Sequence, residues 1–167
     1  MNSTKFKGSE VHLTGNLPQA GSKAPDFTYV KEDLSEGTLN GLGNKKKVII
    51  AVPSLDTGIC QMETKRFNTE LSKRSDVIGL VVSKDLPFAM KRFCAAEGIE
   101  NVQIGSDFRG NFTSQYNTEM TDGPLKGLSS RAVFVLDGEN NIKHTELVGE
   151  VTEEPNYDEI LKMVDSI

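Results

Sequence analysis

The 167-residue sequence has few of the residues that build disulfide scaffolds or metal sites, with two cysteines and two histidines. Two cysteines do not make a disulfide scaffold, and a structural zinc ion requires four ligands at short spacing. Cys60 and Cys94 lie far apart in the sequence, and His12 and His144 fall in segments that we expect to be strands. We therefore predict no metal site, and a cysteine pair of this kind is more often catalytic or redox-sensing than structural.

Excess positive charge and long apolar runs are also missing. The net charge is -5, and the largest basic cluster is Lys45-Lys46-Lys47, which we interpret as a solvated turn before a strand. This charge argues against nucleic acid or an anionic membrane as a partner. The apolar runs are too short to span a bilayer, and residues 1–10 lack the apolar core of a signal peptide. We expect a cytoplasmic protein.

The composition that remains is typical of a soluble globular protein, with 26% charged and 37% hydrophobic residues. The length is sufficient for one domain with its own core. We predict a single domain over residues 1–167, in which residues 1–16 form an N-terminal hairpin extension.

Strands and helices alternate through the middle of the sequence, and an antiparallel hairpin with a helix follows. The two strands around the first helix should be parallel, because a helix connects them. This order predicts an α/β protein with a mixed central sheet flanked by helices on both faces, an elaborated thioredoxin-like fold. The expected strands are 27–30, 48–52, 77–83, 102–105, 132–136 and 142–148, the expected helices are 60–74, 85–98, 109–116 and 157–164, and residues 31–44 are expected to form turns.

The segment PSLDTGIC, residues 53–60, has the clearest chemical signal. It follows the apolar strand 48–52, and Cys60, Thr64, Phe67 and Leu71 then share one face of a helix. Cys60 therefore lies in the first turn of a helix, where free N–H groups and the helix dipole favour a thiolate over a thiol. A thiolate is a nucleophile, and open α/β sheets place their sites at this end of the strands.

Taken singly, the residues around Cys60 leave several interpretations open. A C-x-x-C redox pair is excluded, because Glu63 occupies the second position. Cys94 can be a small buried residue on an amphipathic helix, Thr57 a simple helix cap, and Arg131 a surface charge.

Three motifs together resemble one family. P-x-x-x-T-x-x-C at the end of a strand is the active-site motif of the peroxiredoxins. The full run PSLDTGIC, the run SKDLPFA leading to RFC at residues 92–94, and DGPLKGL ahead of Arg131 are similar to the thiol peroxidase subfamily, which are atypical two-cysteine peroxiredoxins. The resemblance extends over nearly the whole chain and matches at every catalytic position.

The resemblance implies a role for each site residue. Cys60 would be the peroxidatic cysteine, which attacks a hydroperoxide and becomes a sulfenic acid. Cys94 would be the resolving cysteine, which forms an intramolecular disulfide with Cys60. Arg131 would stabilise the thiolate and bind the peroxide, Thr57 would cap the helix or bind the peroxide, and Pro53 would shield the sulfur. Thioredoxin would reduce the disulfide, with no flavin, haem or metal, and the subfamily is typically homodimeric.

Two further expectations concern the substrate and the movement of the chain. Leu55, Ile59, Leu125 and Leu128 suit an alkyl hydroperoxide, although hydrogen peroxide should also react, and the same residues can instead pack against a second subunit. Two cysteines on helices rarely start close enough to bond. We therefore expect the first helical turn at Cys60, or the Cys94 segment, to unfold locally in each cycle.

Three rival functions use the same sequence features. A general thiol–disulfide oxidoreductase should contain C-x-x-C, which this chain lacks. A redox sensor that passes its disulfide to a partner protein would use the same two cysteines as a peroxidase. A purely structural thioredoxin-like protein would hold two inert, buried thiols.

Overall fold

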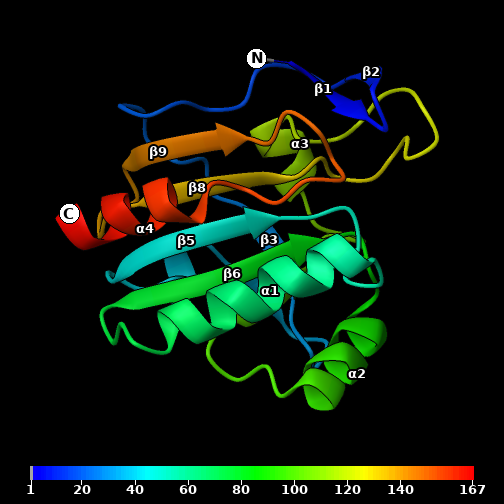
Figure 1. The fold of residues 1–167 in the computed structure, drawn as a ribbon. Helices are drawn as coiled ribbons and strands as arrows, with labels where there is room; N and C mark the ends of the chain where they lie inside the picture. The colour runs from blue at the N-terminus through cyan, green and yellow to red at the C-terminus, as the bar shows by residue number, and fades with distance from the viewer. Residues whose placement is uncertain (1) are drawn as a thin grey trace.

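A seven-stranded mixed sheet forms the centre of the protein (Figure 1), in a computed structural model that describes residues 2–167. The strand order is β4-β3-β7-β6-β5-β8-β9. The strands of this sheet are β3 (Thr28–Val30), β4 (Glu36–Thr38), β5 (Lys46–Ala51), β6 (Val77–Ser83), β7 (Gln103–Ser106), β8 (Ala132–Leu136) and β9 (Ile142–Leu147).

The central strands are the ones with the longest apolar, β-branched runs. β5 pairs in parallel with β6 on one side and antiparallel with β8 on the other, so that Ala51 lies beside Ala132. All five residues of β8 are buried, as expected for a strand covered on both faces. The parallel pairing of β5 and β6, predicted from the helix between them, is confirmed.

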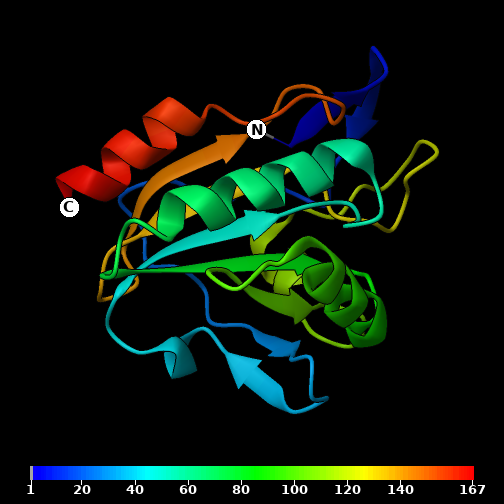
Figure 2. The same ribbon diagram turned by 60° about the horizontal axis from the view of Figure 1, so that its bottom comes forward.

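Helices cover both faces of the sheet, as predicted (Figures 1 and 2). The helices α1 (Gly58–Leu71), α2 (Pro87–Glu97) and α4 (Tyr157–Ser166) pack on one face, where Phe67, Met90 and Ile160 share an apolar cluster. The short α3 (Phe112–Tyr116) packs on the other face with Phe27 and Phe134. None of the helices within residues 2–167 has the length and apolar content that crossing a membrane requires.

The predicted N-terminal hairpin is present as β1 (Ser3–Phe6) and β2 (Ser9–His12). Its turn, Lys7-Gly8, has positive φ angles of 51° and 84°, the conformation that suits a two-residue hairpin. The hairpin lies against the loop after β9, because the N–H of Lys5 donates to the carbonyl of Gly149 and the N–H of Val151 donates to that of Lys5. It therefore holds the 149–151 segment in place.

Three local predictions were wrong. Residues 31–44, expected as turns, contain the edge strand β4 and a 3-10 helix, η1 (Asn40–Leu42). The helix expected over residues 109–116 begins only at Phe112, where the carboxylate of Asp107 accepts from the N–H groups of Phe112 and Thr113. Lys47, expected in a solvated turn, lies in β5 with a fully buried side chain whose ammonium donates to the carbonyl of Lys45.

The C-terminal end of α2 depends on a glycine in a left-handed conformation. Gly98 caps this helix with φ 67° and ψ 35°, a left-handed conformation, and a Cβ at this position would meet no atom within 4 Å. The cost of Gly98→Ala is therefore a backbone cost, and we expect it to lower the free energy of unfolding by about 1 kcal/mol in urea denaturation.

Gly149→Ala is the matched control, because Gly149 also has open space around its Cα but no positive φ. We expect this substitution to change the free energy of unfolding by less than about 0.5 kcal/mol. Equal losses of stability in the two variants would show that the left-handed conformation of Gly98 is not the cause of the loss.

Candidate active site

Cys60 lies in the first turn of α1, directly beyond the end of β5. Thr57 precedes the helix in an extended conformation, and its hydroxyl accepts from the N–H of Cys60 at 3.4 Å and donates to the carbonyl of Ser54 at 3.2 Å. The predicted cap at Thr57 is thus confirmed. The side chain of Cys60 is fully buried, so its sulfur lies beneath the surface of the protein.

Arg131 contacts the sulfur of Cys60. Because Ala132 pairs with Ala51, the residue before β8 lies beside the strand end from which the Cys60 loop departs. The Nη1 atom of Arg131 donates to Cys60 Sγ at 3.2 Å, and its Nε donates to the carbonyl of Val151 at 2.9 Å. The side chain of Arg131 is 2% exposed, which rules out the surface-charge interpretation.

Glu63 completes this group and was missed as a site residue. Its Oε2 atom accepts from Arg131 Nη1 at 2.7 Å, and its side chain is fully buried. Burial raises the pKa of Glu63 to about 7, and this effect outweighs the opposing effect of Arg131. A signal was present in the sequence, because Glu63 shares the buried helix face of Cys60 and a buried carboxylate requires a partner.

Arg131 remains a cation in this environment. Burial disfavours its charge, but the nearby Cys60 and Glu63 outweigh burial, so the pKa of Arg131 is raised above its ordinary value. A permanent positive charge that donates a hydrogen bond to Cys60 Sγ can stabilise negative charge in the reaction at this sulfur. The geometry is therefore suited to an activated sulfur nucleophile.

A cavity of about 360 Å³ opens beside this group. Pro53, Thr57 and Arg131, which the sequence predicted as site residues, all line it. Its apolar walls include Ile59, Leu125 and Leu128, together with Phe6, Met62 and Val151. Leu55, predicted together with these residues, shares an apolar cluster with Cys60 but lines a different cleft.

Cys94 lies on the same face of the sheet as Cys60 but is not bonded to it. It is 7% exposed in α2, belongs to the same apolar cluster as Cys60, and both thiols are free. Burial, with a smaller contribution from Glu32, raises the pKa of the Cys94 thiol to about 11. Cys94 is therefore a protonated thiol at neutral pH in this conformation.

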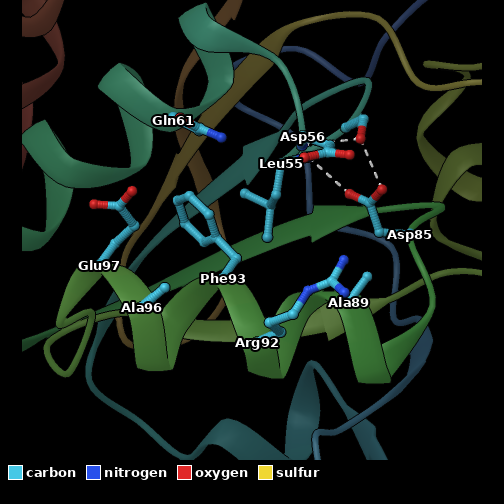
Figure 3. Close-up of a pocket in the computed structure, with 10 residues that line it drawn as sticks. Leu55, Asp56, Gln61, Asp85, Ala89, Arg92, Phe93, Ala96 and Glu97 are labelled. Carbon is cyan, nitrogen blue, oxygen red and sulfur yellow. Dashed lines mark hydrogen bonds between the residues drawn. The ribbon is translucent and has the colours of Figure 1, made fainter.

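A second cleft, of about 330 Å³, lies between the two segments that carry the cysteines (Figure 3). Leu55 and Gln61 line it from the side of Cys60, and Ala89 and Phe93 line it from α2. The side chains of α1 and α2 are thus not closely packed against each other here.

Comparison with known proteins places the chain among peroxide-reducing thiol proteins. Residues 19–161 match the redoxin family. A thiol peroxidase of Leptospira interrogans serogroup Icterohaemorrhagiae serovar copenhageni is 51% identical over 160 residues, which cover 94% of each chain. The resemblance inferred from the three sequence motifs is confirmed.

Solved structures agree with the fold. A peroxiredoxin-like protein from Aquifex aeolicus superposes with a TM-score of 0.95 at 43% identity, over 99% of this chain and 97% of that one. A thiol peroxidase from Chromobacterium violaceum superposes with a TM-score of 0.88 at 23% identity, over 99% of this chain and 96% of that one. The predicted thioredoxin-like fold with an N-terminal hairpin is therefore confirmed.

The raised pKa of Glu63 predicts how stability depends on pH. The folded protein keeps the Glu63 proton up to about pH 7, whereas the unfolded chain loses it near 4.5. Between these values the folded state binds more protons, so this residue makes the free energy of unfolding fall as the pH rises. We expect urea denaturation between these two pH values to show that Glu63→Gln removes this fall.

Glu100→Gln, at an exposed position, is the control and should leave the pH profile of the wild type unchanged. If the profiles of Glu63→Gln and the wild type run parallel, the buried carboxyl does not hold its proton in the folded state.

Proposed function

The chain belongs to the redoxin family, as a peroxiredoxin of the thiol peroxidase type, and we propose that it reduces hydroperoxides with Cys60 as the peroxidatic cysteine. One observation carries the proposal. The Nη1 atom of Arg131 donates to Cys60 Sγ at 3.2 Å, and Arg131 also lines the cavity beside it. Cys60 itself is fully buried and does not line the cavity, so a peroxide in the cavity would reach the sulfur beside Arg131.

In the first step the thiolate of Cys60 attacks an oxygen of the peroxide. A bond forms between sulfur and oxygen, and the bond between the two peroxide oxygens breaks. Sulfur is oxidised to a sulfenic acid, and the departing oxygen leaves as alkoxide or hydroxide and takes a proton from solvent. Arg131 stabilises the negative charge as it moves from sulfur to the departing oxygen. The Thr57 hydroxyl can donate to the bound peroxide once its proton leaves the carbonyl of Ser54.

In the second step the thiol of Cys94 condenses with the sulfenic acid. A disulfide forms, water leaves, and an external dithiol, for which we propose thioredoxin, reduces the disulfide to two thiols. We infer a change of conformation in the cycle, because a disulfide needs Cα atoms within about 7 Å and the two free, buried thiols lie on separate helices. Exposure of Cys94 would also remove the burial that keeps it protonated.

The cavity favours alkyl hydroperoxides as substrates. Ile59, Leu125 and Leu128 offer an apolar wall to an alkyl group, while Arg131 faces the reacting oxygens. Hydrogen peroxide fits the same cavity without using this wall. Met62, 51% exposed at the rim, extends the apolar surface toward solvent, which is consistent with the homodimer that the family resemblance implies.

A redox relay is the alternative function, because it would use the same cysteine pair and pass the disulfide to a partner protein. A general thiol–disulfide oxidoreductase has less support. Glu63 occupies the position of its second cysteine and accepts a buried hydrogen bond from Arg131. Catalytic turnover separates the peroxidase from the relay.

Peroxide consumption coupled to thioredoxin, thioredoxin reductase and NADPH tests the proposal. We expect turnover in the wild type and none in Cys60→Ser, because the nucleophile is lost. Given one equivalent of peroxide, Cys94→Ser should stop at the sulfenic acid, which a dimedone adduct detected by mass spectrometry would reveal.

The outcomes separate the rival functions. Oxidation of Cys60 without turnover, but with transfer of the disulfide to another protein, would favour the relay. If both thiols can still be titrated after exposure to peroxide, the proposal is wrong.

The apolar wall predicts selective effects on large substrates. Leu128→Asn should raise KM for cumene hydroperoxide by about tenfold, because apolar contacts in a pocket discriminate by that order, and should leave hydrogen peroxide nearly unaffected. Leu34→Asn, at an exposed leucine outside the cavity, should change neither substrate. Equal loss of activity on both peroxides in Leu128→Asn would show that the wall does not bind the alkyl group.

A further inference from the structure

Asp85 ties the loop that carries Cys60 to the end of β6. Its Oδ1 atom accepts from the hydroxyl of Ser54 at 2.7 Å, and its Oδ2 accepts from the backbone N–H of Leu55 at 2.7 Å. The hydroxyl of Ser83, the last residue of β6, also donates to Oδ2, at 2.6 Å. Figure 3 shows the carboxylate of Asp85 pointing toward this loop, with the bonds drawn as dashed lines.

The same residue lies at the entrance to the helix that carries Cys94. Asp85 directly precedes Leu86, the N-cap of α2, and its N–H donates to the hydroxyl of Ser83 at 3.2 Å. Its carbonyl accepts from the hydroxyl of Ser106 at the end of β7. Asp85 is therefore fixed to the ends of β6 and β7. From this position, just before the helix that carries Cys94, it holds the segment before Cys60.

These bonds have the properties of a reversible attachment. Charge-assisted bonds to a carboxylate are stronger than neutral ones, yet Asp85 and Ser54 are only half-buried, so water can replace the bonds once they break. The cleft of about 330 Å³ lies directly beside them, lined by Ser54, Leu55 and Asp85. When the loop is released, open space separates it from the face of α2.

We propose that Asp85 is a positioning residue that holds the Cys60 loop in its peroxide-reactive conformation and must release Ser54 and Leu55 before the disulfide forms. This inference rests on the proposed function, because it assigns Asp85 to the step between the sulfenic acid and the disulfide. The hydrogen bonds of the Asp85 carboxylate would then determine how fast the disulfide forms.

The consequence is a competition at the sulfenic acid of Cys60. If the loop is released, Cys94 attacks, the disulfide forms and water leaves. If the loop stays in place, a second hydroperoxide oxidises the sulfenic acid to a sulfinic acid and is itself reduced to alcohol or water. The strength of the attachment at Asp85 therefore sets the peroxide concentration at which the two products are equal.

Asp85→Asn tests the inference in a single-turnover experiment without reductant. The reduced protein is mixed with increasing cumene hydroperoxide, and intact-mass spectrometry measures the disulfide and the sulfinic acid. Loss of the charge weakens the attachment, and we expect the concentration that gives equal products to rise about tenfold. Stopped-flow measurements should show faster disulfide formation and slower first oxidation of Cys60.

Asp107→Asn is the matched control. Asp107 is also an aspartate after a strand end. Its carboxylate accepts from Phe112 N, Thr113 N and Thr113 Oγ1 and pairs with Lys84, but it bonds to neither Ser54 nor Leu55. A general loss of stability would affect both variants. We expect the product ratio of Asp107→Asn to match that of the wild type.

Ser54→Ala removes one bond from the loop side and provides an independent measurement if Asp85→Asn does not fold. It should shift the product ratio in the same direction, and the double variant should shift it no further than Asp85→Asn alone. An unchanged ratio in Asp85→Asn, or in Ser54→Ala where only that variant folds, would overturn the inference, as would an equal shift in Asp107→Asn. Failure of the proposed function looks different, because the wild type itself would then form neither product.

Discussion

The buried guanidinium of Arg131 is the interaction on which the site depends. A charge removed from water is tolerated only when partners satisfy it, and Arg131 has them in Cys60, Glu63 and the carbonyl of Val151. These partners come from α1 and from the loop after β9, and Arg131 itself directly precedes β8. The pairing of β8 with β5 brings these elements to one point.

The N-terminal hairpin takes part in the same arrangement through the backbone. Lys5 forms backbone hydrogen bonds with Gly149 and Val151, and the carbonyl of Val151 accepts a hydrogen bond from Nε of Arg131. A segment at the start of the chain thus helps to orient the cation that contacts the sulfur. Phe6, from the same hairpin, also lines the cavity beside the site. The hairpin is therefore part of the architecture of the site and more than an appendage to the sheet.

Most of the fold and the central motif could be predicted, because they follow from local sequence patterns. Features that depend on contacts between distant parts of the chain could not be predicted. β6 was predicted with its observed bounds, because an apolar run and its turn signals lie within one short stretch. β4 could not be predicted, since Glu36-Gly37-Thr38 has no strand pattern and forms by pairing with β3. The burial of Lys47 and the pairing of Glu63 with Arg131 depend on strands and helices that are distant in sequence.

The proposed cycle requires the Cys60 loop to be fixed in one step and to move in the next. Different interactions hold the loop and the sheet beneath it. Contact between Arg131 and Cys60 requires a fixed loop, whereas a bond to Cys94 requires a movable one. β5 and β8 are held by buried apolar clusters, whose opening would expose large apolar areas to water. The loop is held by half-buried hydrogen bonds, which water replaces at a net cost of about 1 kcal/mol each, and by the buried side chains of Leu55 and Cys60, a small part of the area that the clusters bury. Local release of the loop is therefore far less costly than any opening of the sheet that fixes Arg131.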